Sequence, residues 1–302
     1  MRVSRQAWKY LLIPLIVAAL LFTACGKTET VDTTKAPDIP PASTFQMSFD
    51  DFDQMKQAAN AAYSPKGEVP IVQLASLATS TRSSTTASVD ASPAGLLDYT
   101  NVGVAVLAVG YWSGVLVWNL AIPWASFVES FNHEAVQQSD GPWIWTYTVA
   151  VGLDTYTAKL KAEYVGDETH WNMYVSKAGS YTDFNWYSGV SNLPLTHGTW
   201  TLKKSQADPT DFIGIEWNRN TTKGTWDIQY TYIVPNAAEN GSYIKYGATT
   251  DQTYDRFYNL YGKVEDTLTQ IQWNHTTKAG RIKSGNGDWR YWDSTLKNTT
   301  AP

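Results

Sequence analysis

Residues 143–292 alternate between apolar and polar positions with a period of two, in short segments separated by Gly, Asp, Asn or Pro. In residues 226–232, for example, Trp226, Ile228 and Tyr230 alternate with polar side chains. Such alternation predicts β-strands that bury one face and expose the other. We count about ten strands, a series typical of an antiparallel meander, sandwich or barrel. Because an open twisted sheet of about ten strands tends to curl, we predict a strongly curved or barrel-like meander.

The chain just before these strands has a different pattern. It carries no charged side chain from residue 102 to residue 128, and residues 102–122 are largely apolar. This pattern predicts a long helix that is apolar on all sides and is therefore buried by protein. We expect Pro123 to end this helix and to begin a shorter one that runs through Phe131. The sheet would pack on the long helix, which makes the fold class α+β, mainly β.

Two other interpretations of residues 102–122 stay open. The segment is long enough for a transmembrane helix, but the flanking Asp98 and Glu129 are acidic, whereas Lys and Arg orient such spans. A buried pair of strands, residues 102–108 and 115–119, is the other alternative, because short apolar runs do not distinguish strands from helices.

A second, shorter helix is predicted over residues 48–61, with Ser48 and Asp51 at capping-box spacing. Three acids of its first turn, Asp50, Asp51 and Asp53, complement the helix dipole. They lack the spaced oxygen ligands and the glycine of a calcium loop, so we do not assign a metal to them.

The first 25 residues form an export signal, in which a cationic start precedes an apolar run of about 12 residues. Residues 22–25 (Phe-Thr-Ala-Cys) hold the only Cys of the chain. They resemble the lipobox of bacterial lipoproteins, with Phe22 in place of the usual Leu. The resemblance implies that Cys25 is acylated after cleavage and that the exported chain is anchored to the membrane. Gly26, in place of an Asp, implies the outer membrane.

These signals divide the chain into consecutive segments, each with its own composition. The predicted organisation is a lipoprotein signal peptide at residues 1–24, a Pro-containing tether at 25–44, a helical segment with a Ser/Thr-rich loop at 45–137, an antiparallel β domain at 138–297 that packs with the helical segment as one unit, and a tail at 298–302.

The overall composition excludes several classes of protein. The 23 Lys and Arg against 28 Asp and Glu give a net charge of −5, which argues against a nucleic-acid partner. A single Cys excludes a disulfide framework and a Cys-based zinc site. An aromatic content of 14% with 17% charged residues excludes a disordered chain.

No pattern of catalytic residues is visible. The four His residues are isolated in sequence, and there is no phosphate-binding glycine loop. Ser76 and Ser84 lie in the Ser/Thr-rich loop without any sign of a nucleophile. Glu216 and Asp227 lie on consecutive predicted strands and could pair as glycosidase carboxylates, but each lies on the polar face of its strand. We predict no catalytic residue, no metal and no cofactor.

Tryptophan is abundant in the predicted β domain. Trp side chains bury a large area and prefer a partner for the indole N–H, so most of them are expected to form the core. A partly open aromatic cavity could instead hold an apolar or sugar ligand, as in small antiparallel barrels. The candidate ligand-binding residues are Trp145, Trp171, Trp186, Trp217 and Trp226.

Four segments of the β domain resemble uncharacterised envelope lipoproteins of Bacteroidota-type bacteria: residues 198–202 (GTWTL), 215–217 (IEW), 273–281 (WNHTTKAGR) and 292–293 (WD). This resemblance implies no activity and transfers no site. With the lipobox, it favours a non-catalytic envelope lipoprotein that binds a ligand or a partner, or has a structural role. An enzyme acting on envelope glycans or lipids and a membrane-embedded β-barrel are the alternatives.

Overall fold

The computed structural model describes residues 32–63, 100–139 and 141–301. Cys25 with the predicted signal peptide, and Ser76 and Ser84 with their loop, lie outside the described residues. From Ala36 onward the chain forms one compact unit.

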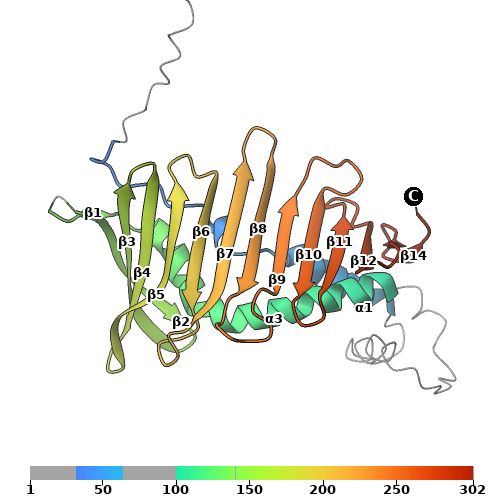
Figure 1. Cartoon of the computed structure of the whole chain (residues 1–302), viewed down its shortest axis with the longest axis horizontal. Helices are drawn as coiled ribbons and strands as arrows, with labels where there is room; N and C mark the ends of the chain where they lie inside the picture. Colours follow the sequence, from blue (N-terminus) through green and yellow to red (C-terminus); the bar gives the residue numbers. More distant parts are fainter. Residues whose placement is uncertain (1–31, 64–99, 140, 302) are drawn as a thin grey trace, which may run out of the picture. The chain divides into compact units, whose positions relative to one another are not determined.

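The described chain is dominated by one antiparallel sheet of 14 strands, in which every strand pairs with its neighbours in sequence (Figure 1). This arrangement confirms the predicted antiparallel meander. The strands are β1 (Val136–Gln137), β2 (Trp143–Val151), β3 (Asp154–Val165), β4 (Glu168–Lys177), β5 (Tyr181–Asn192), β6 (His197–Lys203), β7 (Asp211–Asn220), β8 (Thr225–Tyr232), β9 (Tyr243–Ala248), β10 (Arg256–Gly262), β11 (Thr267–Trp273), β12 (Gly280–Ser284), β13 (Arg290–Trp292) and β14 (Asn298–Thr299).

The sheet is open rather than closed. Its order runs from β1 to β14 without a pairing between these two edges in the described chain. Both edge strands are only 2 residues long and exposed, which limits the unpaired backbone that an edge presents to other chains. The prediction of about ten strands was too low, because strands this short carry no alternating pattern.

The alternation along the strands buries one side of the sheet. In β3, Tyr156, Ala158 and Leu160 are buried, while Thr155 and Thr157 between and before them are exposed. The same rule holds in β8, where Ile228 and Tyr230 are each 1% exposed. These side chains form a single hydrophobic core with residues of the preceding helices.

Glycines on three strands accommodate tryptophan rings from the neighbouring strands. A Cβ on Gly280 would lie 2.3 Å from Trp292 Cζ2, and one on Gly189 would lie 2.2 Å from Trp200 Cε3. The third pair is Gly198 with Trp217, at 2.6 Å from Cζ2. Each glycine thus leaves the space that the ring of its cross-strand partner fills, so the rings lie down on the sheet.

The two described α-helices are α1 (Asp50–Tyr63) and α3 (Thr100–Glu129); two short 3-10 helices, η1 (Ala42–Thr44) and η3 (Ser130–Asn132), flank them. α1 confirms the helix predicted over residues 48–61, with a shift of two residues. Residues 102–108 and 115–119 both belong to α3, which rules out the alternative of a buried strand pair.

The prediction that Pro123 ends the long helix was wrong, since α3 continues through Pro123 to Glu129. The helix bends by 75° between Gly114 and Asn119 instead. Proline clashes with the carbonyl four residues upstream, which for Pro123 is that of Asn119. The bend at that point relieves the clash without ending the helix.

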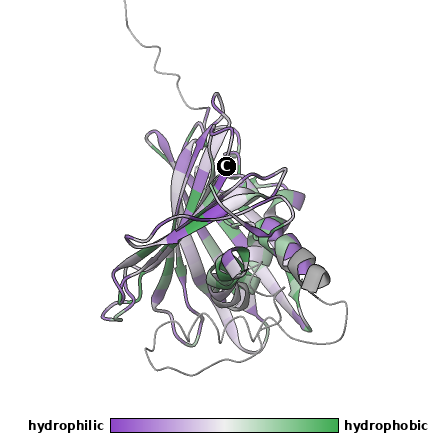
Figure 2. Ribbon diagram, turned by 90° about the vertical axis from the view of Figure 1, so that its right-hand side faces the viewer, coloured by the Kyte–Doolittle hydropathy of each residue, from purple (hydrophilic) through white to green (hydrophobic). Residues whose placement is uncertain are grey.

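α3 runs across the strands and contacts β2, β10, β12, β13 and β14 (Figures 1 and 2). Val102, Ala105 and Phe127 are completely buried, but Tyr111 is 72% exposed, so the expectation of burial on all sides fails there. No single helix in the described ranges is long and apolar enough to cross a membrane, although the two bent halves of α3 have the required length and composition when taken together.

Candidate functional site

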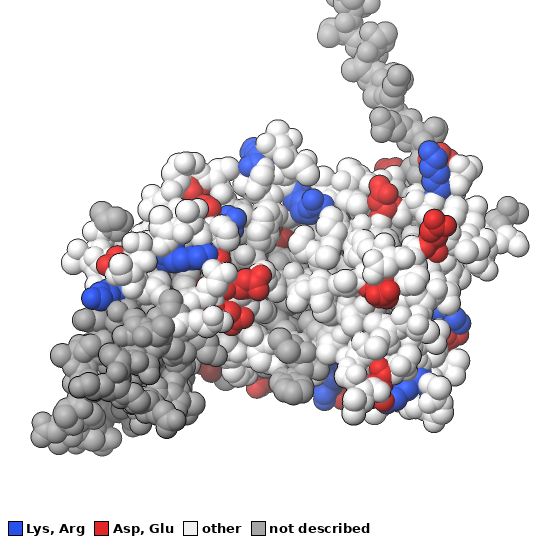
Figure 3. Space-filling view, turned by 180° about the vertical axis from the view of Figure 1, so that it is seen from behind, with Lys and Arg blue, Asp and Glu red and all other residues white. Residues whose placement is uncertain are grey.

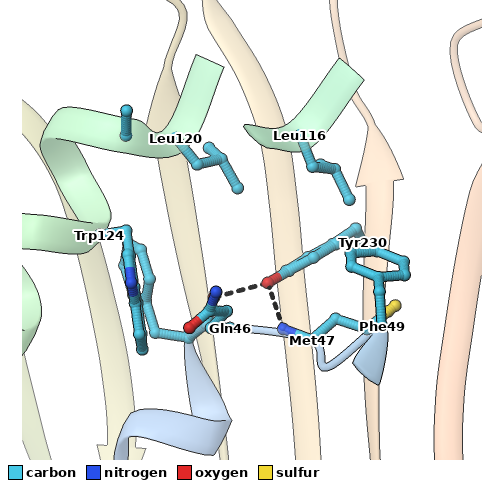
Figure 4. Close-up of a pocket in the computed structure, with 9 residues that line it drawn as sticks. Gln46, Met47, Phe49, Leu116, Leu120, Trp124 and Tyr230 are labelled. Carbon is cyan, nitrogen blue, oxygen red and sulfur yellow. Dashed lines mark hydrogen bonds between the residues drawn. The ribbon is translucent and has the colours of Figure 1, made fainter. Parts of the chain in front are cut away.

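An apolar pocket lies beside the bend of α3, between this helix, the segment 45–49 and strand β8 (Figure 4). Its cavity volume is about 290 Å³. The helix contributes three aliphatic side chains and one indole, and the segment 45–49 contributes two aromatic rings. The lining residues are Phe45, Gln46, Met47, Phe49, Leu116, Leu120, Ala121, Trp124 and Tyr230.

Tyr230 fixes the segment 45–49 against the sheet. Its hydroxyl donates a hydrogen bond to the Phe45 carbonyl oxygen at 2.6 Å and accepts one from the Met47 amide at 2.9 Å. Burial raises the pKa of Tyr230, so the phenol stays neutral and can make both bonds. This buried hydroxyl therefore satisfies two backbone groups of the segment 45–49.

Aromatic rings close one end of the pocket. Phe45 is stacked on Phe127 with 4.7 Å between the ring centroids, and on Trp124 at 6.3 Å. Phe45 also contacts Tyr187 of β5 and Trp200 of β6, so the segment joins α3 to the centre of the sheet. Such contacts add specific geometry to the burial of apolar area.

The pocket can bind but lacks groups for acid–base chemistry. No charged side chain lines it, and its polar side-chain atoms belong to Gln46 and to Tyr230. An apolar lining with very few polar groups is typical of sites that hold an apolar ligand.

The tryptophans predicted to bind a ligand lie elsewhere. Trp145, Trp171, Trp186 and Trp217 are buried in the core, with exposures between 0% and 5%. Trp171, for example, donates its indole N–H to Ser191 Oγ at 2.9 Å. Only Trp226 is half-buried, and it lines a separate hollow beside the β7–β8 hairpin. None of the five lines the apolar pocket.

A buried carboxylate forms the most strongly linked polar cluster near α1. Asp51, with 8% of its side chain exposed, accepts a hydrogen bond from Trp273 Nε1 at 2.9 Å. His275 Nδ1 lies 2.8 Å from the same oxygen, and Lys278 Nζ contacts the other one. Burial opposes ionisation, but the bonds from Lys278, His275 and Trp273 outweigh it and hold the pKa of Asp51 below its ordinary value.

This cluster refines the sequence interpretation of the acids in the first turn of α1. Ser48 Oγ accepts a bond from the Asp50 amide at 3.3 Å, while the carboxylate of Asp51 is turned to the β11–β12 turn. Asp51 therefore ties the start of α1 to the sheet. No local pattern indicates this pairing, because Asp51 and Lys278 are separated by 227 positions.

The remaining candidates do not form a catalytic group. Glu216 is opposite Gln229 in the register, whereas Asp227 is opposite Asn218 and pairs with Lys245 at 3.0 Å. No group of three His, Cys, Asp or Glu side chains suited to a metal ion occurs among the described residues. Acidic and basic side chains are interspersed on the face shown in Figure 3.

The role of residues 45–49 in the pocket was not predicted. The predicted boundary between the tether (25–44) and the helical segment (45–137) falls just before them. A signal was nevertheless present. Phe45, Met47 and Phe49 alternate with Gln46 and Ser48, which is the pattern of an extended chain with one buried face.

Comparisons with protein-family models, with curated proteins and with solved structures found no match.

Proposed function

We propose that the protein is a non-catalytic lipoprotein of the cell envelope, anchored through acylated Cys25 to the outer membrane, and that its β domain binds an apolar ligand. The pocket beside the bend of α3 carries the second part of the proposal. It is lined almost entirely by aliphatic and aromatic side chains and offers only an amide and a phenol as polar groups.

We also propose that the sheet curves around α3, so that the helix and the segment 45–49 occupy most of its concave face. The contacts of α3 with β2 near one edge and with β12, β13 and β14 near the other support this arrangement. The pocket would then be the space that the helix leaves free at its bend. This explains why the ligand site is built from α3 and not from the buried tryptophans.

The affinity for an apolar probe tests the pocket. The chain with Cys25→Ala, which removes the acylation site, is titrated with N-phenyl-1-naphthylamine, whose fluorescence rises in an apolar environment. Ala121 is exposed at the rim of the pocket, so Ala121→Phe should narrow the pocket and weaken binding without disturbing the core.

Ala150→Phe is the matched control, because Ala150 is an exposed alanine on β2. We expect saturable binding that Ala121→Phe weakens and Ala150→Phe does not. Absence of saturable binding, or equal binding by both variants, refutes the assignment of the pocket.

Metabolic labelling with a fatty-acid analogue tests the anchor independently. The wild-type chain should incorporate the label and fractionate with the outer membrane, and Cys25→Ala should do neither. A wild-type chain without label contradicts the lipoprotein assignment but leaves the pocket result intact.

One observation favours an enzyme as the second candidate. His275 has a half-exposed imidazole whose Nδ1 is held by the buried Asp51, which is how a general base is oriented. No Ser, Thr or Cys side chain is hydrogen-bonded to this imidazole among the described residues. Turnover of ester or glycoside substrates that is lost in His275→Ala would favour this candidate over a binding protein.

A further inference from the structure

A second hollow, polar in character, lies in the middle of the sheet beside the hairpin where β7 turns into β8. We call it the hairpin cleft and define it by Asn218, Arg219, Lys223, Trp226, Asp227 and Phe257. Its volume is about 760 Å³. A smaller hollow of about 360 Å³, reaching Ser43 and Thr44 of η1, shares Asn218, Arg219, Trp226 and Asp227 with it. The two hollows therefore adjoin at the β7–β8 hairpin.

Register and a glycine place the aromatic and polar groups side by side. Asn218 is opposite Asp227, Asp227 is opposite Gly247, and Gly247 is opposite Phe257. A Cβ on Gly247 would lie 2.7 Å from Phe257 Cε1. The glycine thus lets the phenyl ring lean toward Asp227. An apolar surface and a carboxylate share the floor of the cleft.

The carboxylate of Asp227 is oriented with part of its capacity unused. Its Oδ1 accepts a hydrogen bond from Asn218 Nδ2 at 3.2 Å and pairs with Lys245 Nζ at 3.0 Å. Within the described chain, no hydrogen bond is made to its Oδ2. A carboxylate held in this way can accept a hydrogen bond from a hydroxyl of a ligand.

Two cations of the cleft have no carboxylate partner. Neither Arg219 nor Lys223 forms an ion pair among the described residues, although the backbone amide of Arg219 donates to the Thr196 carbonyl at 2.6 Å. Arg219 is half-buried and lies opposite Trp226 in the register, whereas the guanidinium that lies over the Trp226 ring is that of Arg256, at 5.9 Å from the ring centroid. Since Asp227 is already balanced by Lys245, the cleft carries a positive surplus in a chain whose net charge is −5.

We propose that the hairpin cleft binds an acidic saccharide. A guanidinium recognises a carboxylate or sulfate by charge-assisted hydrogen bonds, and the phenyl ring of Phe257, which lies on the same face of the sheet as Asp227, offers an apolar surface to a sugar ring. The Asp227 carboxylate and the Asn218 amide match the hydroxyl groups of the ring. The threonines at 221, 222, 225, 249 and 250 line the same cleft and add further donors and acceptors.

This site is separate from the apolar pocket, with which it shares no lining residue. The saccharide proposal is therefore independent of the apolar-ligand proposal, and either can fail alone. Together they describe an envelope protein with one apolar site beside the helix and one glycan site at the β7–β8 hairpin.

Titration calorimetry of the full chain in detergent tests the proposal. The acidic probes are trigalacturonic acid and a heparin-derived tetrasaccharide. Trigalacturonic acid methyl ester keeps the sugar rings and removes the charge, and ADP tests an aromatic anion without a sugar acid. We expect at least one acidic probe to bind, the methyl ester to bind about ten-fold more weakly, and added salt to weaken the binding of the acid.

Arg219→Gln and Lys223→Gln identify the site, and Lys223 lies in an exposed turn where the substitution cannot disturb the core. Lys161→Gln is the control, because Lys161 is a half-buried lysine on β3. Arg219→Gln should weaken binding about ten-fold and Lys161→Gln should leave it unchanged. The proposal is overturned if neither acidic probe binds, if ADP or the methyl ester binds as tightly, or if both cleft variants bind like the control.

Discussion

The buried carboxylate of Asp51 should be one of the main links between the helical part of the chain and the sheet. Replacement of Asp51 by Asn keeps the shape of the side chain and removes its charge. The variant loses the ionic contact with Lys278 and the charge-assisted bond from His275 at 2.8 Å. It can keep the bond from Trp273, which a neutral amide oxygen also accepts.

The expected cost follows from the burial of the partners. Removing one member of a buried ion pair destabilises a protein by about 3–5 kcal/mol when the other member stays buried. Lys278 is 23% exposed and His275 is 52% exposed, so both can regain part of their hydration in the variant. We therefore expect Asp51→Asn to lower the free energy of unfolding by about 2–3 kcal/mol, a value in the range of charge-assisted hydrogen bonds.

Urea denaturation followed by tryptophan fluorescence measures this loss as a shift of the midpoint by about 1 M. Asp53→Asn is the matched control, since Asp53 lies in the same helical turn and is exposed. It should change the free energy of unfolding by about 0.5 kcal/mol or less. If Asp51→Asn and Asp53→Asn have the same midpoint, Asp51 does not link α1 to the sheet as described.

The remaining predictions concern pH, packing and the helix. The pKa of Asp51 is lowered in the folded protein. The ionised carboxylate therefore stabilises the fold at pH values above the unfolded pKa of about 3.9, and this stabilisation is lost as the pH falls through the folded pKa. Between about pH 5 and pH 2, the urea midpoint of Asp51→Asn should therefore decline less than that of the wild type. Gly280→Ala places a Cβ 2.3 Å from the ring of Trp292 and should cost about 1–3 kcal/mol, whereas Gly214→Ala, with 3.5 Å to its nearest neighbour, should change stability little; equal melting temperatures of these two variants would contradict the packing of rings on glycines. Leu116→Asp puts an unpaired charge at a position that is 3% exposed and should lower the free energy of unfolding by several kcal/mol. Ala121→Asp, at an exposed position of α3, should change it little. Melting temperatures from circular dichroism distinguish the two variants.

The local pattern of the sequence was sufficient to predict the meander. Each central strand buries one face, so the alternation seen at Tyr156, Ala158 and Leu160 or at Ile228 and Tyr230 is read directly from the residue types. The antiparallel order follows from short turns, which cannot connect parallel strands. These features depend on neighbouring residues only, and that is why they could be predicted.

Features that depend on distant residues could not be predicted. The edge strands β1 and β14 have 2 residues each, too few for a period, and are strands only because a neighbour pairs with them. Pro123 is compatible with a helix whose backbone bends one turn upstream, which the residue types alone do not reveal. The contact of Tyr230 with the Phe45 carbonyl joins positions that are 185 residues apart.

The candidate ligand site could not be predicted from the sequence either, but for a different reason. Abundant tryptophan suggested an aromatic cavity, but an indole that lies on the glycine of the next strand has one face against the sheet. Trp200 and Trp217 are each only 1% exposed, because the other face packs within the core. Most of the abundant tryptophans therefore belong to the core of this sheet and not to a ligand site.

Both proposed sites occur instead where regular packing is interrupted. The apolar pocket lies where α3 bends between Gly114 and Asn119, because a bent helix cannot stay in continuous contact with the layer beneath it. The hairpin cleft lies where β7 ends and Gly247 removes a side chain from the row of cross-strand neighbours. If this reasoning holds, straightening α3 by Pro123→Ala should reduce the binding of the apolar probe and leave the binding of the acidic saccharide unchanged. Equal loss at both sites would mean that the substitution acts through global stability, and unchanged binding of the apolar probe would mean that the bend does not create the pocket.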